Sequence, residues 1–146
     1  MREYRSSSHA IYEIHLHIVW VTKYRKAVLG GDVGLRLREL LRDICRVEKV
    51  TVIKGHISKD HVHLMISIPP QITISNLVQK LKGKSVYKLL GEFQKLRQQY
   101  WGGHLWARGY FCRSSGNVTD EIIKQYISNQ LHEDDEDFRV EGEISP

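Results

Sequence analysis

The sequence predicts an α+β fold in which helices cover one face of a single sheet. Three observations support this prediction. Strand-like and helix-like segments follow one another in the order β, α, β, β, α, β, the strand-like segments are rich in β-branched and aromatic residues, and the helix-like segments repeat apolar residues every three or four positions. This is the order of a ferredoxin-like or RRM-like antiparallel sheet. One more helix is expected after the last strand.

The first half of the chain contains one expected strand and one expected helix. The strand covers residues 11–24, IYEIHLHIVWVTKY, and ends at a basic cluster before Gly30 and Gly31. The helix runs from Val33 to about Lys49 and is expected to be capped near Asp32. Its apolar positions fall at helical spacing: Val33, Leu37, Leu40, Leu41, Ile44 and Val47. This spacing predicts an amphipathic helix.

The second half completes the pattern. Residues 50–58 and 61–70 are expected to form a hairpin of two strands, with the turn at 58–60. A second long helix begins near Thr73 and runs to 93, with an interruption expected at Gly83 or Gly91. The segment GYFCRS at 109–114 is expected to be the fourth strand, and a final helix is expected over 119–132.

The length of 146 residues suits one domain, expected over 1–146 with a core at about 10–132 and an acidic tail at 133–146. No apolar run approaches the roughly 18 residues that a membrane span needs, and the first residues contain no apolar signal segment, so we expect a cytoplasmic protein with no membrane partner. The two cysteines, Cys45 and Cys112, suit reduced thiols rather than a disulfide framework.

The charge is unevenly distributed along the chain. The net charge is +5, but the last fifteen residues hold seven acidic side chains and one arginine, so the rest of the chain is more strongly basic than the total. A basic domain of this size is typical of nucleic-acid binding, because neutralising phosphates releases condensed counterions. A merely solvated basic surface is the alternative.

Two histidines stand one residue apart in the stretch KDHVHLMISIPP. Alternate residues of a strand share a face, so Val62, Leu64, Ile66 and Ile68 are expected to face the core. His61 and His63 then point to the other face, about 7 Å apart at their roots. Both imidazoles could reach one divalent ion there. Alone, such a pair also fits two partly exposed histidines.

The first strand carries a second pair, His15 and His17. If the fold is ferredoxin-like, this strand lies beside the strand that contains His61, and four histidines share one sheet face. Strand geometry does not decide which pair holds a metal. A structural role or a phosphate contact for His15 and His17 is as consistent with the sequence as metal ligation.

The expected last helix offers further candidates. Tyr126 and Gln130 are four residues apart, on one helical face, beside an apolar stripe that would dock the helix. A phenol is a poor nucleophile at its ordinary pKa of about 10, so its attack on a phosphodiester would need a metal to offset the developing charge. A glutamine carbonyl one turn away could complete the ligands of that metal. The alternative is an ordinary packing role for Tyr126.

These residues together resemble a known family. The stretch DHVHLMISIPP, the YxxxQ pattern of Tyr126 and Gln130, the opening HLHIVWVTKYR and the stretch ISNLVQKLKGKS are similar, in order, to the single-tyrosine HUH transposases of the TnpA type, from the IS200/IS605 group of insertion sequences. The resemblance runs from about residue 10 to 132. The name HUH describes two histidines around a bulky hydrophobic residue, which here are His61, Val62 and His63.

The resemblance implies a metal-dependent endonuclease and strand transferase that acts on single-stranded DNA at hairpin-flanked element ends. Tyr126 would be the nucleophile that forms a 5′-phosphotyrosine link, while His61, His63 and Gln130 would hold Mg²⁺ or Mn²⁺. It also implies a homodimer in which the tyrosine helix serves either its own or the other subunit. Rejoining would need no ATP, because the covalent link preserves the energy of the broken bond.

Several basic and aromatic residues are candidates for DNA contacts. The basic candidates are Lys23, Arg25, Lys80, Lys82, Lys84 and Lys88. Tyr24 accompanies the first cluster, and Trp101, Trp106 and Tyr110 could stack on bases, although packing in the core or an interface is the favoured reading of these three.

Two other functions fit part of the sequence. A non-catalytic single-strand-binding module would explain fold and charge, and a domesticated, repeat-processing relative would share every site residue. A two-histidine phosphoesterase does not fit, because both histidine pairs lack the serine or threonine of the His-x-Ser/Thr motif.

Overall fold

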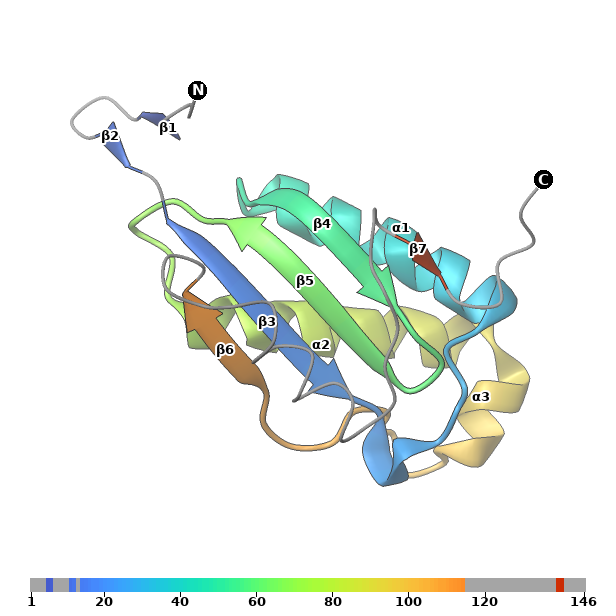
Figure 1. The fold of residues 1–146 in the computed structure, drawn as a ribbon. Helices are drawn as coiled ribbons and strands as arrows, with labels where there is room; N and C mark the ends of the chain where they lie inside the picture. The colour runs from blue at the N-terminus through green and yellow to red at the C-terminus, as the bar shows by residue number, and fades with distance from the viewer. Residues whose placement is uncertain (1–4, 7–10, 13, 115–138, 141–146) are drawn as a thin grey trace.

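In the computed structural model, residues 5–6, 11–12, 14–114 and 139–140 are described (Figure 1). The helices are η1 (Lys23–Arg25), α1 (Gly31–Val47), α2 (Ile74–Glu92) and α3 (Gln94–Gln99). The strands are β1 (Arg5–Ser6), β2 (Ile11–Tyr12), β3 (His15–Val21), β4 (Thr51–Ile57), β5 (His61–Ser67), β6 (Phe111–Ser114) and β7 (Arg139–Val140). The expected final helix over 119–132 lies outside the described residues.

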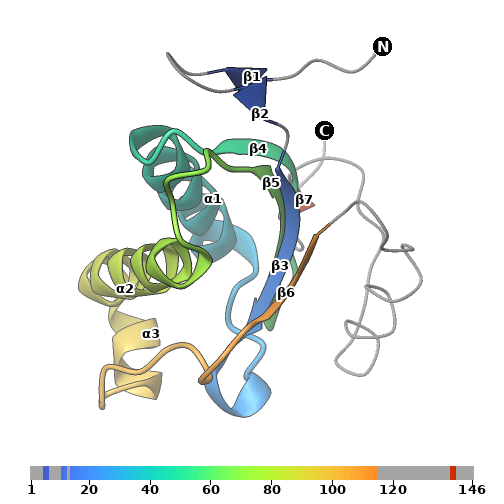
Figure 2. The same ribbon diagram turned by 90° about the vertical axis from the view of Figure 1, so that its left-hand side faces the viewer.

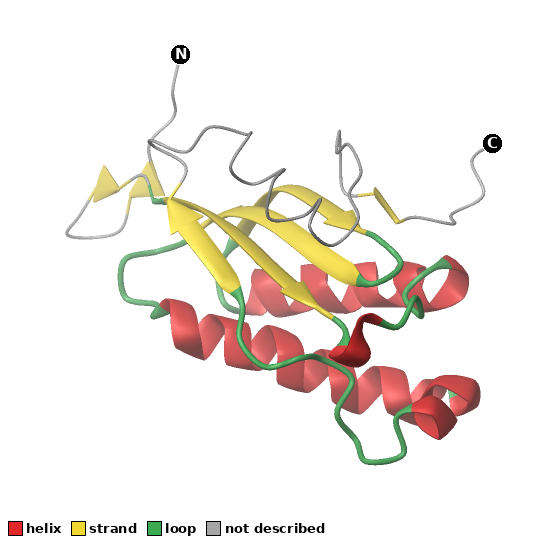
Figure 3. Cartoon of the chain, turned by 60° about the horizontal axis from the view of Figure 1, so that its bottom comes forward, coloured by secondary structure: helices red, strands yellow, loops and turns green. Residues whose placement is uncertain are grey.

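The main sheet has the strand order β6-β3-β5-β4-β7. Its first four strands pair antiparallel, and with α1 and α2 they give the predicted βαββαβ arrangement. Both long helices lie on the same face of this sheet (Figures 2 and 3). The α+β, ferredoxin-like prediction is confirmed for the described part of the chain.

The hydrophobic core lies between the sheet and the two long helices. The alternation predicted for β5 is confirmed, because Val62, Leu64 and Ile66 are fully buried in the core and Ile68 is nearly so. The expected first strand is shorter than predicted: β3 ends at Val21, and the chain then turns sharply through η1. Positive φ angles at Tyr24 and Arg25 end the extended conformation there.

Helix α1 differs from its prediction at both ends. It begins at Gly31 with Gly30 in the N-cap position, so Asp32 lies inside the first turn instead of capping it. Its carboxylate still lies near the positive end of the helix dipole. Val47 is the last residue of the helix and is largely exposed, in contrast to the buried position that the periodicity predicted. The apolar stripe therefore ends one turn earlier.

Helix α2 is continuous through both glycines at which an interruption was expected. Thr73 caps it, accepting a hydrogen bond from the backbone N–H of Asn76 at 3.3 Å. The break comes instead at Phe93, whose extended backbone separates α2 from α3. Glycine costs a helix interior only about 1 kcal/mol, which packing against the core offsets.

Trp106 packs in the core as expected. It lies edge-to-face on Trp20 with ring centroids 5.8 Å apart, and its indole Nε1 donates to the Ser85 hydroxyl at 3.1 Å. Trp101 does not pack in the core, since 89% of its surface is exposed. Tyr110 is also exposed, at 39%.

One contact of the sheet was not predicted. The short strand β7 lies in the segment expected to be an acidic tail, and it pairs parallel with β4. Val140 is buried beside Gly34 of α1, where a Cβ atom would overlap both the Val140 side chain and the Leu29 carbonyl. Glycine at position 34 therefore permits this close approach.

Among the described helices, none is long and apolar enough to cross a membrane.

Candidate functional site

The candidate site lies where β3 ends and β5 begins, on the face of the sheet opposite the helices. His61 and His63 are the first and third residues of β5, and in the antiparallel register they pair with Val21 and Val19 of β3. Because Val62 between them faces the core, both imidazoles project to the other face, as predicted. Both are buried.

The structure joins one histidine of β3 to this pair. The Nδ1 of His17 lies 3.1 Å from the Nε2 of His63, and the two rings stack with centroids 5.4 Å apart. One of these nitrogens must carry the proton for the contact to be a hydrogen bond. His15 does not join the group, because it pairs with Ser67 at the opposite end of β5.

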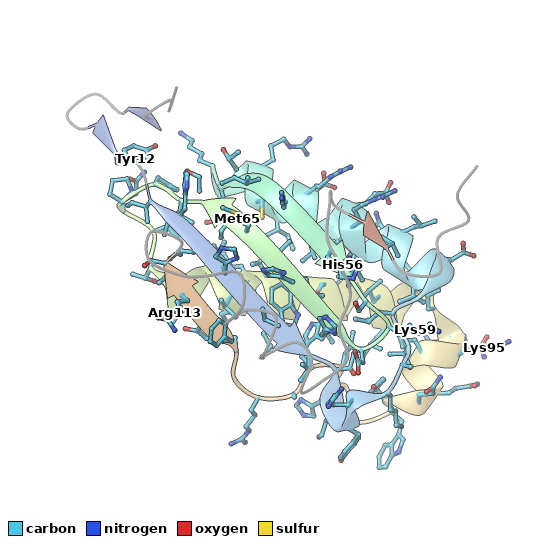
Figure 4. All side chains as sticks on the ribbon, viewed as in Figure 1. Tyr12, His56, Lys59, Met65, Lys95 and Arg113 are labelled. Carbon is cyan, nitrogen blue, oxygen red and sulfur yellow. The ribbon has the colours of Figure 1, made fainter. Side chains whose placement is uncertain are left out.

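His56 is a member of this group that the sequence analysis did not single out. It lies on β4 directly opposite His63, and its ring centroid is 6.3 Å from that of His61. Its Nε2 lies 2.7 Å from the hydroxyl of Ser58. Figure 4 places His56 on the sheet face turned away from the helices. The sequence contained the information needed to find His56, because a tight hairpin over 58–60 fixes the register that sets His56 against His63.

Asp60 holds His61, and Arg25 in turn holds Asp60. The Oδ1 of Asp60 accepts from the Nδ1 of His61 at 3.0 Å, if that nitrogen carries the proton, and the Oδ2 of Asp60 accepts from Arg25 at 3.2 Å. Asp60 is buried, whereas 41% of the Arg25 side chain is exposed. A carboxylate on Nδ1 fixes the tautomer and leaves Nε2 as the nitrogen suited to bind a metal.

The imidazole nitrogens of this group suit a divalent ion, provided that the contact between His17 and His63 opens. Two imidazoles two residues apart on one strand, one of them oriented by a carboxylate, are suitable ligands for such an ion. Ligation through Nε2 of His63 requires its contact with His17 to open. Within the ranges that the structure describes, no three His, Cys, Asp or Glu side chains form a group that could hold a metal. A complete ligand set would therefore need another donor, such as a glutamine oxygen.

The predicted nucleophile and third ligand, Tyr126 and Gln130, lie outside the described residues. Their proximity to the histidines stays a prediction.

The basic candidates fall into two separate places. Lys23 and Arg25 lie in the turn that follows β3, beside Asp60. The other four lysines belong to α2, which lies on one face of the sheet (Figure 2), whereas the histidines project to the opposite face. Two of them have contacts within the chain, Lys80 with Glu48 at 2.9 Å and Lys82 with the carbonyls of Ala107 and Gly109. Burial also lowers the pKa of Lys82. Lys84 and Lys88 are exposed.

Comparison with known families gives a direct assignment. Residues 10–130 match the family model described as transposase, IS200 like. The chain belongs to the IS200-like transposase family.

The similarity to individual members of this family covers most of this chain and most of each relative. The chain is 36% identical over 120 residues to the ISDra2 transposase TnpA of Deinococcus radiodurans, covering 82% of this chain and 86% of the relative. It is 32% identical over 134 residues to the transposase for insertion sequence element IS200 of Salmonella typhimurium, covering 92% and 88%. These similarities confirm the IS200/IS605 TnpA resemblance.

Solved structures agree on the fold. A crystal structure of a transposase candidate from Deinococcus radiodurans R1 has a TM-score of 0.77 and 34% identity, covering 86% of this chain and 97% of that one. A REP-associated tyrosine transposase, solved bound to a REP hairpin, has a TM-score of 0.58 at 15% identity, covering 88% and 72%. At that low identity the second likeness shows the fold alone.

Proposed function

We propose that this IS200-like transposase cuts and rejoins single-stranded DNA through a covalent phosphotyrosine, with Tyr126 as nucleophile. The observation that carries the proposal is the buried pair His61 and His63, with His61 held by Asp60, in a chain of this family. A polar group as costly to bury as an imidazole is retained where it has a partner or a function.

In the proposed reaction, the phenolic oxygen of Tyr126 attacks the phosphorus of the scissile phosphodiester. A bond forms between that oxygen and phosphorus, and the bond from phosphorus to the 3′ oxygen breaks. The phenolic proton is lost to solvent, and the leaving oxygen takes up a proton to become a 3′-hydroxyl. The 5′ end stays on the protein. Attack by another 3′-hydroxyl reverses the step, so no ATP is needed.

The ligands of the divalent ion, Mg²⁺ or Mn²⁺, would be His61, His63 and Gln130. When bound, the ion would polarise the phosphate and offset the charge that develops in the transition state. Asp60 would keep the Nδ1 of His61 protonated and its ring fixed, so that Nε2 faces the ion. His17 would have to release the Nε2 of His63 for ligation through that nitrogen.

We further propose that the chain acts as a homodimer on hairpin-flanked DNA. A protein of the same fold, the REP-associated tyrosine transposase, is bound to a REP hairpin, which is the kind of partner proposed here. Lys23 and Arg25, beside the histidines, are better placed for phosphates near the cut than the four lysines of α2. Lys80, Lys82, Lys84 and Lys88 would contact DNA only on the helical side of the molecule.

The test is covalent capture. The protein is incubated with labelled single-stranded DNA from the flanks of its own gene, with Mn²⁺ or with chelator, and separated on a denaturing gel. We expect a protein-sized shift that needs Mn²⁺ and is absent in Tyr126→Phe and His61→Ala. The Tyr126→Phe variant should retain binding in a native gel.

Other outcomes would change the assignment. Cleavage that persists in Tyr126→Phe would overturn the mechanism. Binding without any covalent product, across both gene flanks, would favour a non-catalytic single-strand-binding module. A covalent product formed only on dispersed genomic repeats would favour a domesticated relative.

A further inference from the structure

The turn after β3 holds an aromatic side chain in the solvent. Tyr24 is 75% exposed and has φ 61° and ψ 14°, and Arg25 after it also has a positive φ of 50°. Two consecutive non-glycine residues in the left-handed region are costly, about 1 kcal/mol or more each. Such a conformation persists only where its surroundings enforce it, and it is often associated with function.

The surroundings of this turn do enforce it. The Thr22 hydroxyl donates to the Lys26 carbonyl at 2.9 Å, and the backbone N–H of Arg25 donates to the Thr22 carbonyl at 3.0 Å. The backbone N–H of Thr22 donates to the backbone carbonyl of Asp60 at 2.9 Å, and that of Lys23 donates to the carbonyl of Leu105 at 2.7 Å. The backbone is fixed from several sides, while the Tyr24 ring lies outside. The turn therefore fixes the backbone from which the Tyr24 ring projects into solvent.

A second exposed aromatic residue, Trp101, directly follows a residue that contacts this turn. The Tyr100 hydroxyl donates to the Lys23 carbonyl at 3.1 Å, and the Lys26 ammonium lies 5.0 Å from the centre of the Tyr100 ring. The segment after α3 is thus fastened to the turn, as Figure 1 shows at the end of β3. Trp101, next in this segment, is 89% exposed. Burying such a ring on a ligand would recover a large apolar area.

Cations accompany these rings. The ammonium groups of Lys23 and Lys26 lie 5.3 Å and 5.8 Å from the centre of the Tyr24 ring. Exposed aromatic rings interleaved with lysines are the combination that binds single-stranded nucleic acid, because the rings stack on unpaired bases and the cations hold the backbone. Duplex DNA keeps its bases stacked on one another and offers no free base face to these rings.

The surface adjoins the candidate site. Val21, the last residue of β3, pairs with His61, and the turn begins immediately after it. Arg25 of the turn contacts Asp60, the residue that holds His61. A strand bound on the turn would therefore lie next to the end of β3, where His61 pairs with Val21.

We propose that Tyr24 and Trp101, with Lys23 and Lys26, form a stacking platform for unpaired bases of the DNA substrate. The platform would hold the single strand beside the histidines, largely independently of base sequence, since every base has a stacking face. This inference rests on the proposed function for its substrate, but binding to the platform requires neither the metal nor Tyr126.

The test measures binding in the presence of chelator, so that no cleavage occurs. Fluorescence anisotropy with a short labelled oligodeoxynucleotide that lacks self-complementarity gives the dissociation constant. We expect Tyr24→Asn and Trp101→Ala each to weaken binding about 5-fold to 100-fold, as stacking losses at other single-strand sites do. Asparagine tolerates the left-handed backbone, so Tyr24→Asn removes the ring without disturbing the turn.

Two variants serve as controls. Tyr24→Phe keeps the stacking ring and should bind within about twofold of the wild type. Tyr87→Ala removes a tyrosine of matching exposure, 78%, from α2 in the helical layer, and should bind as the wild type does. Because Trp20 and Trp106 are buried, quenching of tryptophan fluorescence by the oligonucleotide should report on Trp101 and disappear in Trp101→Ala.

The outcomes separate this inference from the proposed function. Tight single-strand binding that is unchanged in both Tyr24→Asn and Trp101→Ala would overturn the platform and leave the nuclease proposal standing. An equal loss in Tyr87→Ala would also overturn it, since the effect would then not belong to this surface. A wild-type protein that binds no single strand at all would overturn the platform and the proposed substrate together.

Discussion

The carboxylate of Asp60 lies 3.0 Å from the Nδ1 of its neighbour His61, while its other oxygen lies 3.2 Å from Arg25. Asp60 therefore occupies one imidazole nitrogen of a residue whose other nitrogen we propose as a metal ligand. A carboxylate in this position orients the ring and raises its basicity.

The first prediction concerns this contact. Asp60→Ala should weaken Mn²⁺ binding about 10-fold to 100-fold, the usual loss when the partner of a ligating histidine is removed. Asp60→Asn should lose less Mn²⁺ affinity, because its amide oxygen still accepts from the Nδ1 of His61. Isothermal titration calorimetry with Mn²⁺ measures both. Asp43→Asn removes the carboxylate of an exposed ion pair with Arg46 and serves as the control. Equal affinity in Asp60→Ala and Asp43→Asn would argue against an orienting role.

A second prediction separates the histidines that share the sheet face. His61→Ala and His63→Ala should each lose most Mn²⁺ affinity, because each removes a proposed ligand. His17→Asn and His56→Asn should keep it within a few-fold, because they leave Asp60 and both ligands in place. The electron paramagnetic resonance spectrum of bound Mn²⁺ measures the difference. If His17→Asn abolished binding while His63→Ala did not, the ligand pair would have to be reassigned to β3.

A third prediction concerns stability and the packing of α1. Gly34→Ala should lower the free energy of unfolding by about 1–3 kcal/mol, because its Cβ would overlap the Leu29 carbonyl and Val140. Gly83→Ala is the matched control within α2, where a Cβ meets no atom within 4 Å. It should be neutral or stabilising by up to about 1 kcal/mol. Urea denaturation measures both changes. A Gly34→Ala variant as stable as the wild type would contradict the packing of Val140 on α1.

A fourth prediction follows from the buried thiol of α1. Burial raises the pKa of Cys45 to about 12, so almost no thiolate exists at neutral pH. A maleimide should therefore label Cys45 very slowly in the native protein and rapidly in urea, as mass spectrometry of the peptides would show. Rapid native labelling of Cys45 would contradict its burial.

The same thiol gives the direction of a pH effect. In the unfolded chain Cys45 releases its proton near pH 8.5, whereas in the folded protein it keeps the proton to about pH 12. Between these values the unfolded state binds fewer protons, so the contribution of Cys45 to stability falls as pH rises. In Cys45→Ala, this part of the loss of stability at alkaline pH should be absent when urea denaturation is measured at a series of pH values.

Much of the fold could be predicted because it follows from local patterns. Alternation placed Val62 and Leu64 in the core and His61 and His63 on the other face, and a two-residue period allows no other arrangement once one face is buried. Errors occurred where local propensity is weak. The start of α1, the end of β3 and the break at Phe93 depend on tertiary contacts that composition does not encode.

The sequence by itself determined the order of the elements, the pair of histidines on one strand face and the family motifs, because each depends on spacing along one segment. Only the tertiary structure decided which other groups reach that pair. His17 and His56 meet it through strand register, and Arg25 and Asp60 meet through a turn held in a left-handed conformation. The contacts of His17 with His63 and of Arg25 with Asp60 join residues far apart in the chain, and their geometry depends on packing that no single segment specifies. His56 is the exception, because its register follows from the hairpin that contains it.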